Sequence, residues 1–593
     1  MRRRIGATAV RALPVLWPLA LAVLMLGGAL LPGYVLTYDM VWVPDLTLRG
    51  DFLGLGSSLP RAVPSDLVVA VLDEVVPGMV LQKAVLLGTL VLAGAGAWRM
   101  VPGGSVLGGL AASTLYVWNP FVVERLVIGH WPLLMTYAAL PWIHLCARRV
   151  VSDGRAWPGL VLWLAFASLS PVGGLVAGGL AVVGVAASGR GAWRPAAWTM
   201  CAVAAVNAPW AVAGVLHGSG SLSDPAAVRL FSAQGEGVLP AWAAVLGLGG
   251  IWNAEVVPGS RTTWVAVVAL VLVLTTCAVG LGPWRRLTSR ADRRALAIPA
   301  LIGLVLALAG AAVPGTVGWL VEQVPGAGLA RDGTRFVALV APLQAVLLGL
   351  GVSRVVDLVP VRALGLTLGT VLVLSPVTLM PDAVAGVSGR LGAVGFPMEY
   401  ADARGALSAS QRAGHTGDVL VLPFTSYRRP EWNDGRRTLD PLGRYLPVDY
   451  LASDTLVVSG VTIPGEDLRA QRVASALGSL EGVELEHALS GEGIGWVVLD
   501  SEASQALVAA GADDTRYGLD PVLAQARVLH DGKTMTLWEL PRQGAASPRG
   551  SLGIPARVVL GLAWLAAAVA LSGAVLVRGR RAWDTSRQMH RSR

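Results

Sequence analysis

Long apolar runs recur along the first two-thirds of the chain, and one more lies near its end. A helix needs about 20 apolar residues to cross the hydrocarbon core of a bilayer. The pattern therefore predicts a polytopic α-helical membrane protein with about twelve spans, in which one close pair is divided only by SPVGG. The expected spans are residues 13–34, 79–98, 104–119, 131–147, 157–171, 172–188, 195–215, 263–284, 296–313, 336–353, 362–380 and 555–577.

The pattern changes between residues 381 and 553, where charge is frequent and short β-type runs alternate with helical ones. DVLVLPF (418–424) and GWVVLD (495–500) are continuous apolar runs typical of buried parallel strands. An amphipathic helix is expected at 465–480, and the Asp531-Gly532 pair predicts a hairpin turn. GEGIG (491–495) precedes its strand, whereas the glycines of a dinucleotide-binding fingerprint follow a strand and open a helix. The segment therefore predicts a turn. This region is predicted to be an α/β domain.

Composition supports a membrane protein. Of the 593 residues, 54% are hydrophobic and 14% are charged, with mean hydropathy +0.60, whereas a soluble protein carries about 25% charged residues. The net charge of +9 is nearly all arginine. In a membrane protein such residues are first of all topology signals, so nucleic acid is not expected as a partner.

Alternate short loops hold most of these arginines, and both termini are arginine-rich as well. By the positive-inside rule these loops are cytoplasmic. We therefore expect a multi-pass protein of the cell membrane, with both termini cytoplasmic and residues 381–553 extracytoplasmic. The expected domains are 1–380 (transmembrane), 381–553 (extracytoplasmic) and 554–593 (last span and basic tail). The loop arginines are Arg99, Arg148, Arg149, Arg155, Arg190, Arg194, Arg285, Arg286, Arg290, Arg293, Arg294, Arg354 and Arg362.

The first outer loop carries two candidate catalytic acids, Asp39 and Asp45, just past the end of the first span. Asp39 lies nearer the helix, between aromatic residues suited to the membrane interface. Partial burial there is expected to raise its pKa and to fit it for a general base. The other reading is a solvated loop, for which acids need no explanation.

The next two outer loops supply candidate ligands for a lipid phosphate. FVVERLVIGHW (121–131) has the pattern of a short amphipathic helix lying along the interface, with Glu124, Arg125, His130 and Trp131 directed out of the hydrocarbon. GLARDGTRFVAL (328–339) places Arg331 and Arg335 beside a span, where guanidinium groups match phosphate oxygens. The other readings are an interfacial anchor and a surface ion pair around Asp332.

These segments resemble the GT-C glycosyltransferase superfamily. YDMVWVPD (38–45) stands at the family's catalytic first loop, although Asp39 and Asp45 are farther apart than its closely paired acids. RDGTRF (331–336) stands where related actinobacterial arabinosyl- and mannosyltransferase-like proteins carry an arginine-rich loop. LPFTSYRRPEWNDGRRTLDPLGRYLP (422–447) looks like uncharacterised actinobacterial relatives.

The resemblance implies a polyprenyl-phosphate sugar donor and a cell-envelope glycan or glycolipid acceptor on the outer face. Asp39 would take the acceptor proton, and Arg125, Arg331 and Arg335 would stabilise the leaving phosphate. Asp45 or Asp66 could assist a divalent cation, although no metal-ligand spacing is present, so the cofactor stays open.

Two other functions stay open. A transporter or flippase of lipid-linked saccharides would need ionisable groups at mid-membrane, and His144 and Asn207 are the candidates. A non-catalytic scaffold for envelope assembly could use SYRRPEWNDGRR (426–437) to bind glycan or an anionic polymer. The same segment could instead cover the membrane site.

Overall fold

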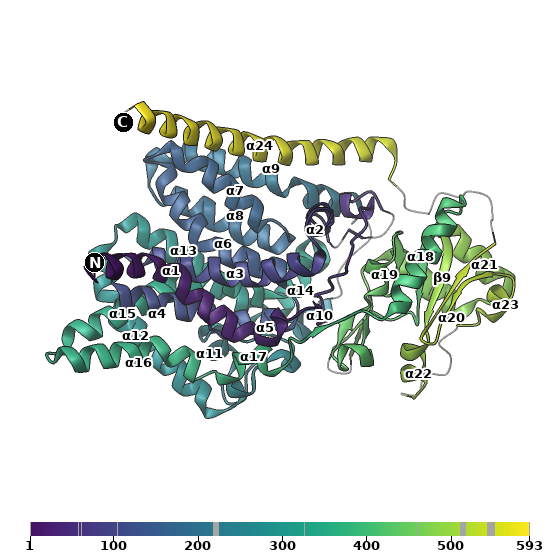
Figure 1. The fold of residues 1–593 in the computed structure, drawn as a ribbon, viewed down its shortest axis with the longest axis horizontal. Helices are drawn as coiled ribbons and strands as arrows, with labels where there is room; N and C mark the ends of the chain where they lie inside the picture. The colour runs from purple at the N-terminus through teal and green to yellow at the C-terminus, as the bar shows by residue number, and fades with distance from the viewer. Residues whose placement is uncertain are drawn as a thin grey trace.

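The computed structural model describes residues 2–56, 59–60, 62–103, 105–217, 225–324, 326–458, 461–509, 517–541 and 552–591. A large helical bundle occupies one side of the molecule, and a smaller part with a β-sheet projects from one end of it (Figure 1). The two termini lie at the opposite end of the bundle (Figure 1).

The bundle is built from the apolar runs, and each expected span contains a helix. Shorter helices connect them, including α2 (Ser65–Asp73), α10 (Pro225–Leu230), α11 (Ala241–Leu246) and α14 (Pro314–Gln323). Of these, α2, α10 and α14 lie at the end that faces the sheet (Figure 1). The main helices are α1 (Arg2–Leu26), α3 (Gly78–Met100), α4 (Val106–Val117), α5 (Pro120–Val127), α6 (Trp131–Val150), α7 (Trp157–Ala167), α8 (Pro171–Ala186), α9 (Trp193–His217), α12 (Trp264–Leu287), α13 (Arg290–Ala312), α15 (Ala341–Leu358), α16 (Arg362–Thr378) and α24 (Ile554–Arg591).

Fewer helices can cross a membrane than the twelve expected. In the described part of the chain, eight are long and apolar enough, or up to nine if the bent pair Arg362–Thr378 and Pro381–Ser388 is one span. The helices of the close pair are short, since α7 has 11 residues and α8 has 16. α6 has 20 residues but ends in Arg148 and Arg149. The protein is multi-pass, and the expected count of twelve spans is not confirmed.

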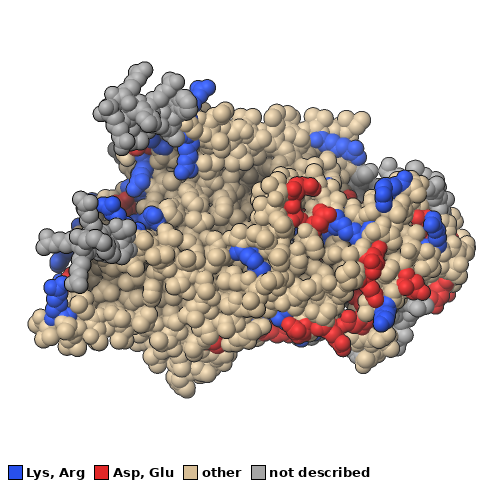
Figure 2. Space-filling model, in the orientation of Figure 1, with Lys and Arg blue, Asp and Glu red and all other residues tan. Residues whose placement is uncertain are grey.

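Charge is distributed unevenly along the molecule. On the face drawn in Figure 2, Lys and Arg gather at the end of the bundle where the termini lie, and most Asp and Glu lie toward the sheet. The middle of this face is largely uncharged, as expected for a surface in contact with hydrocarbon.

The sheet has five strands in the order β10-β11-β9-β3-β6. β3 (Asp418–Leu422) and β9 (Ile494–Asp500) pair in parallel, which confirms the prediction that these two runs are neighbours. Both are almost wholly buried, which explains why neither alternates in polarity. The remaining strands are β6 (Tyr450–Leu451), β10 (Arg527–Asp531) and β11 (Met535–Glu539).

Other predictions for this region hold as well. β10 and β11 form the antiparallel hairpin at Asp531 and Gly532, and the helix expected at 465–480 is α20 (Leu468–Ser479). GEGIG forms the turn into β9, with Gly493 at φ +76°. The sheet is flanked by helices α18 (Met398–Arg412), α19 (Leu442–Tyr445), α21 (Gly482–Gly491), α22 (Ser501–Ala509) and α23 (Asp520–Leu523).

The segment after α1 connects the bundle to the sheet-bearing part. β1 (Tyr34–Val35) pairs with β2 (Ala393–Val394) in an antiparallel ribbon. Farther along, the guanidinium of Arg49 donates hydrogen bonds to the carbonyl oxygens of Gly443 and Val448. The first loop is therefore an integral part of the junction.

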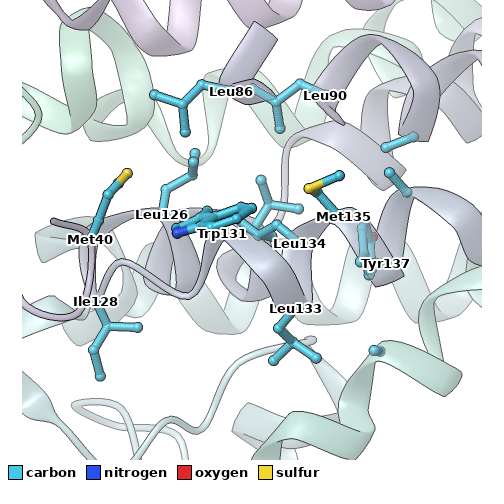
Figure 3. Close-up of a cluster of buried hydrophobic side chains, with 14 of the residues drawn as sticks. Met40, Leu86, Leu90, Leu126, Ile128, Trp131, Leu133, Leu134, Met135 and Tyr137 are labelled. Carbon is cyan, nitrogen blue, oxygen red and sulfur yellow. The ribbon is translucent and has the colours of Figure 1, made fainter. Parts of the chain in front are cut away.

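The expectation of an interfacial helix at 121–131 is wrong. Every residue of α5 is buried, and Trp131 is only 8% exposed. Figure 3 shows the Trp131 ring among Leu86 and Leu90 of α3 and Leu126 of α5. The arginine of α5, Arg125, finds its partners inside the protein, in Asp332 and Thr334.

Candidate functional site

Asp39 lies in a tight loop packed on the turn between α5 and α6. The Asp39 amide donates to the carbonyl of Ile128 at 3.2 Å, and the Thr37 hydroxyl donates to the carbonyl of Val127 at 2.7 Å. Tyr38 adopts a left-handed conformation, with φ +41°. Such a conformation is uncommon for a residue with a side chain, and here it turns the chain so that Asp39 faces His130.

Gly129 makes this close packing possible. Its φ of +83° lies in the left-handed region, which glycine adopts without steric cost. A Cβ atom there would lie 2.3 Å from the amide nitrogen of Met40 and 2.6 Å from the carbonyl oxygen of Thr37. Only glycine allows the Asp39 loop to approach at this distance.

The Asp39 carboxylate accepts two hydrogen bonds from side chains distant in sequence. His130 Nε2 lies 3.1 Å from Oδ2, and the Tyr427 hydroxyl lies 2.5 Å from Oδ1. The carboxylate remains 36% exposed. It is thus fixed in orientation by two donors and is still accessible to a ligand.

The hydrogen bonds define the tautomer of His130. Its Nδ1 lies 3.2 Å from Nη1 of Arg125, and a guanidinium can only donate. Nδ1 is therefore the acceptor, and the ring proton lies on Nε2, which donates to Asp39. The imidazole is neutral in this arrangement.

The electrostatics agree with this assignment. Burial alone would raise the pKa of Asp39, but the hydrogen bonds from His130 and Tyr427 and the charge of Arg335 hold that pKa below its ordinary value. The expected raised pKa is therefore wrong, because its donors outweigh the burial. Burial lowers the pKa of His130, in spite of the nearby Asp39. Near neutral pH the pair is an ionised carboxylate and a neutral imidazole.

Arg125, which donates a hydrogen bond to His130 Nδ1, lies in the interior of the protein. Its side chain is 1% exposed, and its guanidinium donates to Asp332 Oδ2 at 3.4 Å and to Thr334 Oγ1 at 2.5 Å. It does not reach the protein surface, contrary to the expectation of a lipid contact. A buried guanidinium of this kind needs its carboxylate partner to offset its desolvation.

Arg335 completes the cluster and is more accessible. Its Nε donates to Asp332 Oδ2 at 2.9 Å, and its side chain is 30% exposed. The charges of Arg125 and Arg335 outweigh burial and hold the pKa of Asp332 well below its usual range. Asp332 is thus the fixed anion between two cations, of which only Arg335 has an exposed portion.

Two of the predicted site residues lie elsewhere. Arg331 pairs with Glu466 at 2.5 Å and lies over the ring of Phe231. Asp45 pairs with Arg404 at 2.6 Å and is 66% exposed. The structure therefore brings together Asp39, His130, Arg125 and Arg335, and it separates Arg331 and Asp45 from them.

A second group of charges borders the Asp39 loop on its exposed side. Glu255 accepts a hydrogen bond from the Tyr38 hydroxyl at 2.5 Å, and it pairs with Arg437 at 3.1 Å and Arg429 at 3.6 Å. The guanidinium of Arg437 also lies over the Tyr38 ring. Both arginines belong to SYRRPEWNDGRR, so this segment does cover the Asp39 loop.

Sequence reasoning missed the roles of Tyr427, Asp332 and Thr334. Tyr427 is 388 positions from Asp39, and no local pattern predicts such a contact. In the sequence Asp332 stands only beside Arg331 and near Arg335, and its bond to Arg125 depends on the packing of α5. Asp66, considered for a metal, pairs with Arg444 at 2.7 Å. Within the residues that the structure describes, no three His, Cys, Asp or Glu side chains are grouped to hold a metal ion.

The arrangement of a helical membrane bundle with a sheet-bearing part beyond it has counterparts among solved structures. Among solved structures, the chain is similar to the arabinofuranosyltransferase AftD from Mycobacteria, with TM-score 0.53 and 14% identity. The likeness covers 92% of this chain and 40% of that one. A mutant of the same enzyme gives TM-score 0.52 and 15% identity, over 92% and 42%.

This chain spans about two-fifths of the length of AftD. An oligosaccharyltransferase from Archaeoglobus fulgidus gives TM-score 0.37 and 12% identity, over 84% of this chain and 69% of that one. At 14–15% identity the likeness to AftD shows the fold alone. No known family profile and no curated protein matches the sequence.

Proposed function

We propose that the protein is a membrane glycosyltransferase that moves a sugar from a polyprenyl phosphate to a cell-envelope glycan or glycolipid. The observation that carries the proposal is the Asp39 carboxylate, oriented by His130 and Tyr427 and still 36% exposed. The likeness of the fold to a membrane glycosyltransferase supports the proposal.

In the proposed reaction Asp39 takes the proton from the acceptor hydroxyl. The acceptor oxygen forms a bond to the anomeric carbon of the sugar, while the bond from that carbon to the phosphate oxygen breaks. The phosphate leaves with the electron pair. A carboxylate of lowered pKa is a modest base, but it is ionised at neutral pH and therefore always ready to accept the proton.

Arg335 is the residue proposed to contact the leaving phosphate. Among the cations around Asp39 it is bonded to Asp332 and yet partly exposed, and a guanidinium stabilises negative charge that builds on phosphate oxygens. Arg125 acts as a positioning residue, because it is buried and bonded to His130 and Asp332. Arg429 and Arg437 lie on the exposed side, where an anionic portion of the acceptor could approach.

The proposal places Asp39 on the outer face of the membrane, with both termini in the cytoplasm and the sheet-bearing part outside. Positive charge at the end of the bundle that holds the termini supports this orientation. Reporter fusions after Arg194 and after Gly465 should report opposite compartments. The same compartment for both would contradict this orientation.

Asp39→Asn tests the chemistry directly. The change keeps the size of the side chain but removes the proton acceptor, so transfer should fall by at least about a hundredfold. Membranes carrying the variant would be supplied with polyprenyl-phosphate sugars, arabinose and mannose among them, and labelled product would be measured.

Asp45→Asn is the matched control, since it removes a carboxylate from the same loop without touching the Asp39 cluster. It should retain most of the transfer. Full activity of a normally expressed Asp39→Asn protein would refute the catalytic assignment, and the envelope-assembly scaffold would then be the better function.

A further inference from the structure

A partly open cavity of about 50 Å³ lies between α12, α15 and α16 and the end of α4. None of the residues that contact Asp39 lines it. Its wall is mainly apolar, and three polar side chains interrupt it, those of Asn119, Arg261 and Gln344. The apolar part includes Leu115, Ala269, Leu270, Val273, Leu379 and Met380.

Two of the three polar side chains are already bonded within the protein. The Asn119 amide donates to the carbonyl of Leu115 at 2.8 Å and its oxygen accepts from the amide of Val122. The Gln344 amide donates to the carbonyl of Leu246 at 2.8 Å. These contacts account for their presence in an apolar wall.

Arg261 differs from the other two. Its Nε donates to Glu236 Oε2 at 2.7 Å, but its Nη2 has no hydrogen-bond partner among the described residues. The side chain is 5% exposed. Gly247 lies beside this nitrogen, where a Cβ would come within 3.0 Å of it. Other buried arginine nitrogens of the described residues also have no partner, among them Nη1 of Arg428 and Nε of Arg469. Arg261 differs from them because its side chain lines this cavity, where a ligand could accept a hydrogen bond from it and offset the cost of a buried unpaired N–H.

The cavity lies at the level where the helices end. Arg261 precedes the start of α12 at Trp264, and Met380 follows the end of α16 at Thr378. A membrane-spanning helix ends at the depth of the lipid head groups. Arg261 is therefore placed where a lipid phosphate would be.

The apolar wall continues from this level into the bundle. Val273 is nine residues into α12, which is about 14 Å along a helix. The neighbouring face of α12 is open, with Val268 at 55% and Val271 at 54% exposure. A chain entering beside α12 would thus pass from the surrounding hydrocarbon into the cavity without crossing polar surface.

We propose that this cavity binds a phospholipid of the surrounding bilayer. An oxygen of the lipid phosphodiester accepts a hydrogen bond from Nη2 of Arg261. The acyl chain of the lipid lies along α12 from Ala269 to Val273. Glu236 already balances the charge of Arg261, so the single charge of a phosphodiester suits the site better than the double charge of a phosphomonoester. The lipid binds independently of sugar transfer at Asp39.

Native mass spectrometry of the full-length protein in detergent tests the proposal. After exhaustive delipidation, added phosphatidylglycerol should leave one lipid that remains bound when all others are removed. Ala269→Phe fills the cavity without disturbing the pair between Arg261 and Glu236, and it should lower the retained fraction at least about fivefold. Val268→Phe, which adds the same ring on the exposed face of α12, should leave retention unchanged.

A second pair of measurements isolates the head group. Arg261→Met combined with Glu236→Gln removes the donor and its buried counter-ion together, and it should weaken retention by a similar factor. If that double variant does not fold, Val273→Phe provides a second test of the cavity. Asp39→Asn should retain the lipid fully, so loss of transfer and loss of lipid are separable.

Three results would overturn the proposal. Equal retention by folded Ala269→Phe and wild type would place the lipid elsewhere. Wild-type protein that holds no lipid after delipidation and addition would leave the cavity without this occupant. Displacement of phosphatidylglycerol by an equimolar polyprenyl phosphate would assign the cavity to that lipid instead.

Discussion

Tyr427→Phe removes one hydroxyl group and leaves the aromatic ring that packs near Tyr38. In the wild type this hydroxyl donates to Asp39 Oδ1 at 2.5 Å. In the proposed reaction Asp39 is the base, so transfer requires its ionised form and should be lost as pH falls through its pKa. The native pKa is held down by the two donors. Removal of one donor raises it, so the variant should lose activity at a higher pH than the wild type.

The size of the effect follows from the strength of the bond. A hydrogen bond to a charged group contributes about 1.5–3 kcal/mol. The carboxylate is 36% exposed, so water replaces part of the lost bond, and about 1 kcal/mol remains. That value corresponds to about fivefold tighter binding of the proton by Asp39. The acidic limb of the rate profile should therefore move up by about 0.7 pH unit in the variant.

The assay is the pH dependence of sugar transfer in membranes, measured from about pH 2.5 to 7 on equal amounts of folded protein, because the native pKa of Asp39 lies below its ordinary value. Tyr38→Phe is the matched control, because it removes a hydroxyl that bonds Glu255 instead of Asp39. An unshifted limb in Tyr427→Phe would refute the reasoning. So would an equal shift in Tyr38→Phe.

Three further substitutions test the support of the site, each measured by unfolding in detergent. Gly129→Ala should cost at least about 2 kcal/mol and reduce transfer at least tenfold, because the new Cβ displaces the Asp39 loop; near-normal transfer would contradict this. Arg125→Leu should cost about 3–5 kcal/mol by leaving the buried Asp332 with Arg335 as its one remaining ion-pair partner, and a smaller loss would mean that Arg335 alone pairs Asp332 sufficiently. Asp45→Asn should change stability by no more than about 1 kcal/mol, since its ion pair is exposed, and a larger change would indicate that the first loop depends on it.

Some properties of this protein follow from the order of its residues. Apolar runs of bilayer length predict membrane helices because the backbone in hydrocarbon must satisfy its own hydrogen bonds. DVLVLPF and GWVVLD predict paired strands because a strand buried on both faces needs no alternation, and their pairing is observed. Asn119-Pro120 predicts a helix boundary, and Asn119 does cap α5. These signals are local, so the sequence contains them in full.

The same local reasoning failed where packing decides the outcome. The number of full spans depends on how short helices such as α7 and α8 are accommodated by their neighbours. α5 has an amphipathic pattern that also fits a membrane surface, yet Glu124 and Arg125 are buried. Polarity along a helix identifies its two faces, but the surrounding protein decides whether the polar face meets solvent or other polar side chains.

The candidate site shows the same division. The sequence identified Asp39, His130, Arg125 and Arg335 as chemically suitable, because each is an ionisable residue near the end of an apolar run. It could not predict that Gly129 brings the Asp39 loop against His130, or that Tyr427 reaches Asp39 from the sheet-bearing part. The pKa of Asp39 depends on these contacts, since hydrogen-bond donors and burial act on it in opposite directions. The residue types determined the available chemistry, and only the tertiary structure decided which groups meet and in which charge state, because both depend on distances between segments far apart in the chain.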